Sequence, residues 1–323
     1  MTSRSSDPAS PSEASGTAIG SDDSTPGASA PGVLMSVSRP GRARAHAAPS
    51  PGPRRGAESA EGVAPVPVPP LEPGRPPLAF LVDYDGTIAL TDVSDAVMAE
   101  HVPGDWEELA ARYDAGHIGS RRLMEWEIAQ IRRDPEALLR TAAEQPHDPG
   151  FVPFVRAAQA AGIPVEIVSD GFGFFIPPAM ERLGVPELPV ITARTTFANG
   201  AAAIAFPNGH PACFVCGTCK RARVLAHQAA GRAVAFVGDG ESDRYVAGYA
   251  DVVFAKRSLV QLCLDRGWPF RRWTEFGEIE AWLASTLDAW RADPASLPIP
   301  SGRPFFCGPE AWGEGLWDPP PGP

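Results

Sequence analysis

The sequence predicts a doubly wound, Rossmann-like α/β fold, in which helices cover both faces of a parallel sheet. Short apolar runs occur at residues 78–83, 164–170, 233–239 and 251–256. Short, predominantly apolar runs of this kind are typical of strands buried on both faces of a sheet. Helical patterns alternate with the runs, as such a fold requires. These patterns cover residues 149–162, 174–184, 219–231 and 258–267.

Two insertions interrupt the alternation. Residues 93–146 separate the first two strands and have helical spacing at 94–102, 105–116 and 120–134, which predicts a small helical cap. Residues 191–209 predict a β-hairpin with its turn at Asn199-Gly200.

Both ends of the chain differ from this core, which we expect to span residues 78–290. Residues 1–77 are rich in Pro, Ala, Gly and Ser and lack apolar periodicity, so a disordered tail is expected. Residues 291–323 predict an irregular, Pro-rich C-terminal tail. A Pro-rich tail could dock on a partner protein, and this leaves open a non-enzymatic binding module.

Composition narrows the functional classes. The net charge of −11 argues against a nucleic-acid-binding surface, and no apolar run approaches the length of a membrane helix. The N-terminus lacks a signal-peptide core, so we expect a cytoplasmic protein. The five cysteines predict reduced thiols rather than a disulfide framework.

The stretch LAFLVDYDGTIALTD places Asp83 and Asp85 at the end of the first strand. Asp170 ends the second strand, and Asp239 with Asp243 follows the third. Ligands of doubly wound sheets bind beyond the carboxyl ends of the strands, where these acids should gather. Clustered carboxylates favour a hard cation such as Mg²⁺.

Four motifs in order, DYDGT (83–87), SDG (169–171), Lys220 and GDGESD (238–243), resemble those of the haloacid dehalogenase-like phosphatase superfamily. The chain has only one lysine besides Lys220, namely Lys256. The resemblance implies a Mg²⁺-dependent phosphoric monoester hydrolase. Asp83 would be the nucleophile that forms an aspartyl-phosphate, and Asp85 the general acid and base.

The resemblance also implies ligands for the metal and the phosphate. Mg²⁺ would be held by Asp83, the backbone carbonyl of Asp85, and Asp239, with Asp243 in support. The phosphoryl group would be held by Lys220 and by residues of the first two motifs. These residues are Gly86, Thr87, Ser169, Asp170 and Gly171.

A cap restricts access, so the expected substrate is a small phosphorylated metabolite. Trp106, Arg121, Arg122 and Trp126 of the cap are candidate specificity residues. The sequence is most similar to the phosphoserine-phosphatase-like branch, and there to the methionine-salvage phosphatases that act on 2-hydroxy-3-keto-5-methylthiopentenyl-1-phosphate and to relatives without an assigned substrate. Phosphoserine phosphatase and phosphomutase activity remain alternatives, and the non-enzymatic alternative is a module that binds a phosphorylated ligand and docks a partner through its Pro-rich tail.

A second metal site is conceivable in HPACFVCGTCK, where His210, Cys213, Cys216 and Cys219 repeat every three residues. Soft ligands at such spacing can hold Zn²⁺. Known zinc sites usually draw ligands from two segments, so reduced thiols that pack the loop before Lys220 are the favoured interpretation.

Overall fold

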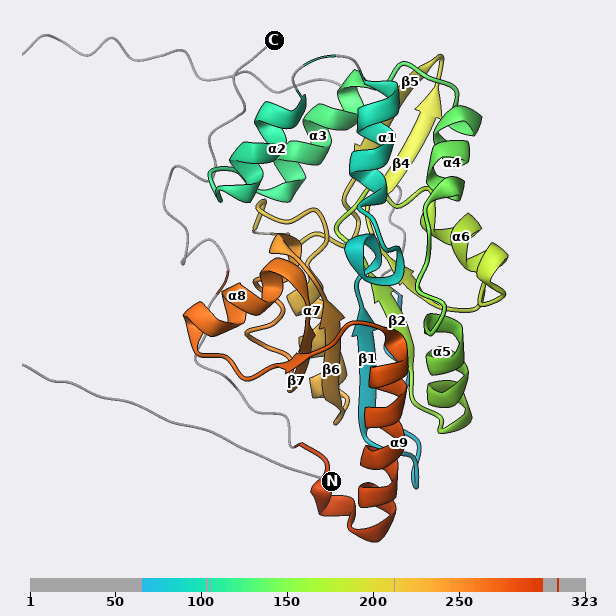
Figure 1. Ribbon diagram of the computed structural model, residues 1–323, viewed down its shortest axis with the longest axis vertical. Coiled ribbons are helices and arrows are strands. Elements are labelled where there is room, and N and C mark those ends of the chain that lie inside the picture. Colours follow the sequence, from blue (N-terminus) through green and yellow to red (C-terminus); the bar gives the residue numbers. More distant parts are fainter. Residues whose placement is uncertain (1–65, 103, 105, 212, 299–306, 308–323) are drawn as a thin grey trace, which may run out of the picture. The chain divides into compact units, whose positions relative to one another are not determined.

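The structure is a computed structural model that describes residues 66–102, 104, 106–211, 213–298 and 307 (Figure 1). Residues 1–65 of the expected N-terminal tail lie outside this range. The same holds for most of the expected C-terminal tail, including Trp312 and Trp317.

A parallel sheet forms the centre of the described chain, with the strand order β3-β2-β1-β6-β7-β8. Every neighbouring pair is parallel, so the predicted doubly wound α/β fold is confirmed. The sequence did not predict β3 and β8, which have two residues each and too little pattern to be recognised. The strands are β1 (Leu78–Val82), β2 (Val165–Val168), β3 (Val190–Ile191), β6 (Ala233–Gly238), β7 (Val252–Ala255) and β8 (Arg271–Arg272).

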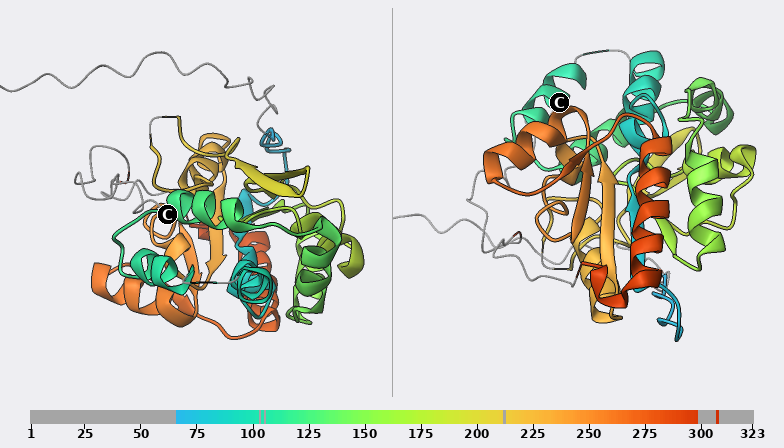
Figure 2. Two further views of the ribbon diagram at one scale, coloured as in Figure 1. Left: turned by 90° about the horizontal axis from the view of Figure 1, so that it is seen from above. Right: turned by 60° about the horizontal axis from the view of Figure 1, so that its bottom comes forward.

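Alternate residues of the strands pack into two separate hydrophobic clusters, one on each face of the sheet. Phe80 of β1 packs with Phe154 and Trp282 on one face, at ring centroid distances of 4.8 and 6.1 Å. Leu81 packs on the opposite face in a cluster with Val224 and Leu259. Helices therefore cover both sides of the sheet (Figures 1 and 2). They are α5 (Phe151–Ala160), α6 (Ile176–Leu183) and α9 (Phe276–Ala292) on the Phe80 face, and α7 (Lys220–Ala229) and α8 (Arg257–Arg266) on the Leu81 face.

Four helices and a hairpin gather beyond the carboxyl ends of the strands (Figure 1). The predicted turn at Asn199-Gly200 is confirmed, with left-handed φ angles of 52° and 76°. The helix expected at 120–134 ends earlier, at Gln130, and a further helix begins at Pro135 with Asp134 as its N-cap. These elements are α1 (Val93–His101), α2 (Trp106–Asp114), α3 (Ser120–Gln130), α4 (Pro135–Glu144), β4 (Arg194–Ala198) and β5 (Ala201–Ala205).

Residues 66–77, assigned by the sequence to the disordered tail, lie against the folded body. Arg232 donates hydrogen bonds of 2.8 Å to the carbonyls of Pro69 and Pro70. Arg223 donates to the Val66 carbonyl at 2.5 Å. Prolines cannot donate to a sheet, but their carbonyls accept well, and this explains how an irregular segment is held.

Arg223 also belongs to a buried ionic group. Its guanidinium contacts both carboxylate oxygens of Glu166, in the middle of β2. The His227 Nε2 atom lies 3.1 Å from the same carboxylate. The pairing offsets the cost of burying an acid inside the sheet.

At the other end of the body, α9 continues to Ala292, past the expected core boundary at residue 290. A short turn, η3 (Pro294–Ser296), follows it, and Leu297 and Cys307 are buried. Within the described residues, none of the helices has the apolar length needed to cross a bilayer.

Candidate active site

The chain turns sharply after β1 through the irregular segment η1 (Tyr84–Ile88), which follows Asp83 directly. Gly86 has a φ of +67°, in the left-handed region that favours glycine. A Cβ atom at this position would lie 2.1 Å from Asp239 Oδ2. Glycine is therefore required both by the backbone and by the close approach of the Asp239 carboxylate.

Lys220, the first residue of α7, lies between two carboxylates. Its Nζ atom is 2.8 Å from Asp83 Oδ1 and 2.6 Å from Asp243 Oδ1, and only 3% of the lysine is exposed. Burial alone lowers the pKa of Lys220, but Asp243 and Asp83 outweigh this effect and raise it. Lys220 is therefore a permanent cation in this cluster.

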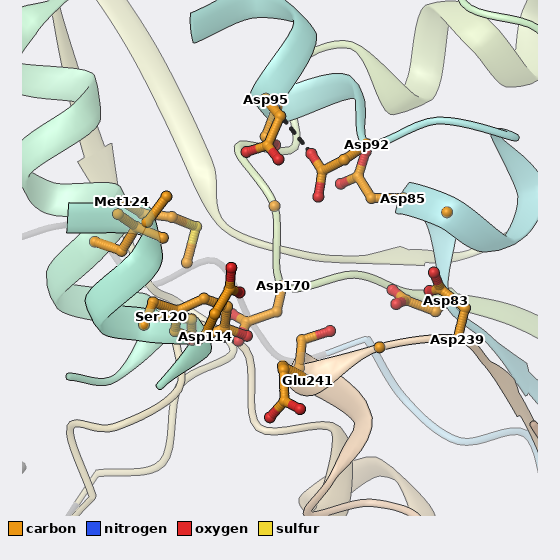
Figure 3. A pocket seen from close by; sticks show the side chains of 18 of the residues that line it. Asp83, Asp85, Asp92, Asp95, Asp114, Ser120, Met124, Asp170, Asp239 and Glu241 are labelled. Carbon is orange, nitrogen blue, oxygen red and sulfur yellow. Dashed lines mark hydrogen bonds between the residues drawn. The ribbon is translucent and has the colours of Figure 1, made fainter. Parts of the chain in front are cut away.

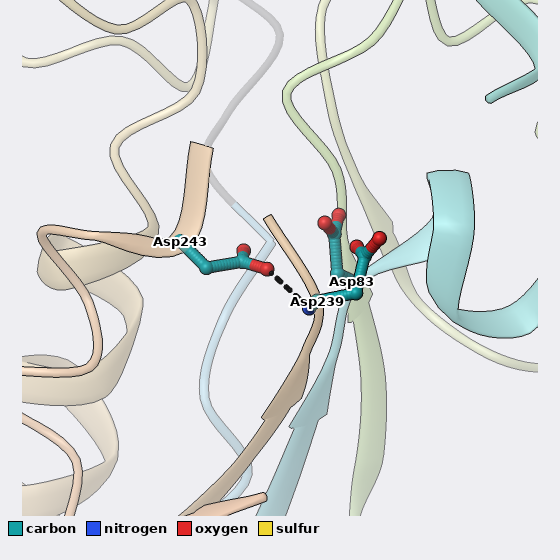
Figure 4. A group of neighbouring side chains, drawn as sticks. All are labelled: Asp83, Asp239 and Asp243. Carbon is teal, nitrogen blue, oxygen red and sulfur yellow. Dashed lines mark hydrogen bonds between the residues drawn. The ribbon is translucent and has the colours of Figure 1, made fainter. Parts of the chain in front are cut away.

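Three carboxylates, those of Asp83, Asp239 and Asp243, bring ligand oxygens within 4.8 Å of one another (Figure 4). Asp243 is fully buried, and its Oδ2 accepts from the backbone N–H of Asp239 at 2.9 Å. Burial, and then the charge of Asp243, raises the pKa of Asp239 to about 6. Burial is also the main cause of the raised pKa of Asp83. An all-oxygen donor set in which Asp83 and Asp243 share a single ammonium group, that of Lys220, fits a hard divalent cation.

Arg257 is a site residue that the sequence did not reveal. Its guanidinium lies 3.1 Å from Asp239 Oδ2 and donates to the Leu90 carbonyl at 2.6 Å. Its φ of 48° is uncommon for a non-glycine residue. The Thr87 hydroxyl donates to the other Asp239 oxygen at 3.2 Å, so Asp239 is fixed from both sides.

The two oxygens of Asp83 have different surroundings. Oδ1 accepts from the Tyr84 N–H at 2.8 Å and faces the Lys220 ammonium, whereas no described group bonds Oδ2. Asp85 has the same asymmetry, because its Oδ1 accepts from the Val93 N–H at 2.9 Å. Burial, and then the charge of Asp92, raises the pKa of Asp85. Each carboxyl group therefore has one fixed oxygen and one that is available for chemistry.

The second motif connects the sheet to the cap. The carboxylate of Asp170, predicted as part of a phosphate site, accepts from the Ser120 hydroxyl and from the Thr218 N–H, the latter at 2.8 Å. This side chain therefore joins α3 to the core. Ser169 is buried, and its Oγ accepts from the Gly171 N–H at 3.1 Å.

A cavity of about 250 Å³ lies between this edge of the sheet and the cap (Figure 3). Asp83, Asp85, Gly86, Asp170, Gly171 and Asp239 line it. Three predicted phosphate ligands do not line the cavity but contact residues that do. Lys220 contacts Asp83, Thr87 contacts Asp239, and Ser169 contacts Gly171. The cap adds a set of residues that the sequence did not single out: Asp92, Ser94, Asp95, Ala110, Tyr113, Asp114, Ser120, Leu123, Met124 and Glu127.

The four predicted specificity residues of the cap are not among the described lining residues. Arg121 and Arg122 bind Glu125, at 3.4 and 2.9 Å. Trp106 and Trp126 pack against the hydrophobic core. The cavity-lining face of α3 is instead formed by positions 120, 123, 124 and 127, which share one side of a helix.

The cysteine-rich loop lines a second, smaller cavity behind Lys220. His210, Cys213, Cys216 and Cys219 meet Cys307 there, although Cys307 is distant in sequence. No three of these ligand atoms lie within 4.8 Å of one another, so the geometry is not that of an assembled zinc site. The thiols are free, and the zinc hypothesis stays a prediction.

Comparison with known proteins decides the family. Residues 80–247, just over half of the chain, match the model of the haloacid dehalogenase-like hydrolases. The chain belongs to this family. The resemblance seen in the four motifs is thereby confirmed.

The relatives that match this hydrolase include proteins named as phosphatases. A 2-hydroxy-3-keto-5-methylthiopentenyl-1-phosphate phosphatase of Geobacillus kaustophilus is 30% identical over 216 residues, which cover 62% of this chain and 93% of the relative. An enzyme of the same name from Lysinibacillus sphaericus is 32% identical over 200 residues, which cover 58% and 85%. Family and relatives together identify the chain as a phosphatase.

Solved structures support the fold. A probable phosphoserine phosphatase from Vibrio cholerae aligns over 67% of both chains, with a TM-score of 0.50 and 21% identity.

Proposed function

We propose that this hydrolase cleaves a small phosphorylated metabolite in a Mg²⁺-dependent reaction that passes through a phosphoryl group on Asp83. The observation that carries the proposal is the asymmetry of the Asp83 carboxylate. Lys220 and the Tyr84 N–H hold Oδ1, while Oδ2 has no described partner and belongs to a residue that lines the cavity. A fixed carboxylate with one available oxygen suits nucleophilic attack.

The reaction would have two displacements. Asp83 Oδ2 forms a bond to phosphorus as the bond to the leaving oxygen breaks, and Asp85 gives its proton to that oxygen. Water then attacks phosphorus, Asp85 takes the water's proton, and the bond between phosphorus and Oδ2 breaks. The raised pKa of Asp85, caused mainly by burial, favours the protonated form that the first displacement needs.

Asp83 and Asp239, together with the Asp85 backbone carbonyl, would hold the Mg²⁺. Asp243 supports them, because its oxygens already bind Lys220 and the Asp239 N–H. When bound, the ion neutralises charge on the carboxylates and on the phosphoryl oxygens. Lys220 favours the ionised form of Asp83 and holds its Oδ1 in place, and Gly86 and Gly171 line the cavity that a phosphoryl group would enter.

The cavity size supports a small substrate, since about 250 Å³ has no room for a folded phosphoprotein segment. The test is release of inorganic phosphate from p-nitrophenyl phosphate and from a panel of phosphorylated metabolites, with Mg²⁺ or with EDTA. We expect release with Mg²⁺ that EDTA abolishes. Absence of release from every compound with Mg²⁺ would refute the proposal, and transfer of phosphate between two positions of a sugar without net release would indicate a phosphomutase.

A further inference from the structure

The cysteine-rich loop before Lys220 has no part in the proposed phosphatase reaction. It lines the second cavity, which has a volume of about 30 Å³ and room for a single ion. Zinc sites with several cysteines usually draw them from two segments of the chain, and Cys307 supplies the second segment that the sequence motif lacks. The soft ligands at this cavity are His210, Cys213, Cys216 and Cys219 from the loop, and Cys307 from beyond α9.

Cys307 is held against the loop by contacts of its own. Its N–H donates to the Tyr249 hydroxyl at 3.1 Å. The Arg221 guanidinium donates to the Cys307 carbonyl and lies 3.4 Å from the Cys307 sulfur. These contacts bring a fourth thiol to the cavity, although Cys307 is 86 residues from Arg221 in the sequence.

The Thr218 hydroxyl is evidence for a ligand that does not depend on the cysteines. Thr218 lines the same cavity and is 1% exposed, and its hydroxyl has no hydrogen-bond partner in the described chain. Unsatisfied buried groups are costly and are often explained by a bound ion or water. The cavity therefore suits a bound ion better than dry packing.

The surroundings of the thiols suit a metal that displaces their protons. Burial, and then the charges of Asp170 and of the neighbouring thiols, raises the pKa of Cys216. The cysteines are thus neutral without a metal, and Zn²⁺ binds four of them as thiolates with the release of four protons. The resulting complex carries two net negative charges, and the guanidinium of Arg221 beside Cys307 offsets part of this charge.

The sulfur atoms have to move inward to share one ion. Among the described residues, no three His or Cys ligand atoms lie within 4.8 Å of one another. In a tetrahedral zinc site the sulfurs are about 3.8 Å apart, because each Zn–S bond is about 2.3 Å long. A change of rotamer moves a cysteine sulfur by about 3 Å. Rotation of the cysteine side chains, with the loop backbone in place, is therefore the movement that we expect on binding.

We propose that the four cysteines of this cavity bind one Zn²⁺ ion as a structural site. The ion joins Cys307 to the loop whose last residue, Cys219, directly precedes Lys220 and α7. The same loop contacts the second motif, because the Thr218 N–H donates to Asp170 at 2.8 Å. The site goes beyond the proposed phosphatase function and does not depend on it.

The test is binding of Co²⁺, a spectroscopic substitute for Zn²⁺, to the reduced full-length protein with Mg²⁺ in excess. Thiolates around Co²⁺ should give sulfur-to-cobalt charge transfer in the near ultraviolet and the intense visible bands of a tetrahedral ion. One equivalent of Zn²⁺ per chain should abolish this spectrum.

Variants locate the ion. Cys307→Ala and Cys216→Ala should each weaken Zn²⁺ affinity at least about a hundredfold, since loss of a group that merely supports a ligand already costs about 10- to 100-fold. Competition with a chromophoric chelator measures this affinity. Cys263→Ala is the matched control, because Cys263 lies in the hydrophobic cluster of the Leu81 face, and it should bind Zn²⁺ like the wild type. Asp239→Asn, which alters only the acid cluster, should keep the cobalt spectrum.

Three results would refute the site. One is the absence of charge-transfer absorption at saturating Co²⁺. Another is Zn²⁺ affinity that is unchanged in both Cys307→Ala and Cys216→Ala. The third is loss of the bound ion in Asp239→Asn, which would place it in the acid cluster. None of these readouts measures phosphate release, so their failure leaves the phosphatase proposal as it stands.

Discussion

Lys220→Met should be strongly destabilising, because it removes the cation shared by two buried carboxylates. The Nζ atom lies 2.8 Å from Asp83 and 2.6 Å from Asp243, and Asp243 is fully buried. Removing one partner of a buried ion pair costs about 3–5 kcal/mol, since the remaining charge is left unpaired. Methionine has a similar length and adds no new charge, so the loss reports the ion pairs rather than a large cavity.

Urea unfolding in the presence of EDTA measures this cost without a divalent cation to replace the lysine. Lys256→Met is the matched control, because it removes the chain's other lysine. The Lys256 Nζ lies 3.9 Å from the Trp273 ring centroid and forms no described ion pair. Its loss should cost about 1 kcal/mol. Equal free energies of unfolding for the two variants, or a loss below about 1 kcal/mol for Lys220→Met, would refute the reasoning.

Three further predictions concern single residues. Gly86→Ala should lower phosphatase activity at least about a hundredfold, because its Cβ would displace the Asp239 carboxylate; Gly74→Ala, at a similar φ of 78° with no atom within 4 Å, should retain activity. Burial raises the pKa of Glu166, but its basic partners outweigh this and lower it. The ionised Glu166 therefore stabilises the fold above its ordinary pKa, and this contribution is lost as the pH falls through the lowered value. The free energy of unfolding should consequently fall more steeply between about pH 6 and 3 in the wild type than in Glu166→Gln. Arg232→Ala should make residues 66–77 more accessible to limited proteolysis, because two hydrogen bonds to proline carbonyls disappear; unchanged cleavage would contradict this attachment.

Local patterns predicted the sheet and the acids of the site. Strands buried on both faces are predominantly apolar, so their ends could be found to within a residue or two even in β2, which contains Glu166. Asp83 and Asp239 follow such strands directly, and parallel topology brings those ends together. Lys220 was recognisable because it begins a helix and because lysine is rare in this chain.

The cap could not be predicted in the same detail. Helical spacing identifies a helix but not which side faces the cavity, and α3 has charged residues on more than one side. Arg121 and Arg122 attracted attention as cations, yet they bind Glu125 away from the cavity. The sequence did contain one signal for Glu127, because this acidic residue shares a helix face with the apolar residues Leu123 and Met124.

Contacts between residues distant in the sequence could not be predicted either. The irregular residues 66–77 resemble the preceding tail in composition, and only the positions of Arg223 and Arg232 show that they are held. Arg257 follows Lys256 without any motif, and its role depends on a left-handed backbone and on Asp239, 18 residues earlier.

The most direct test of the account is to locate the phosphoryl group during turnover. Asp85→Asn should slow hydrolysis of the intermediate by about a hundredfold or more, because no carboxylate remains to deprotonate water. Rapid acid quench of this variant with p-nitrophenyl phosphate and Mg²⁺, followed by peptide mass spectrometry, should find a phosphoryl group on Asp83. The same quench should find none in Asp83→Asn. A phosphoryl group on any other residue, or phosphate release by Asp83→Asn at the wild-type rate, would contradict the account.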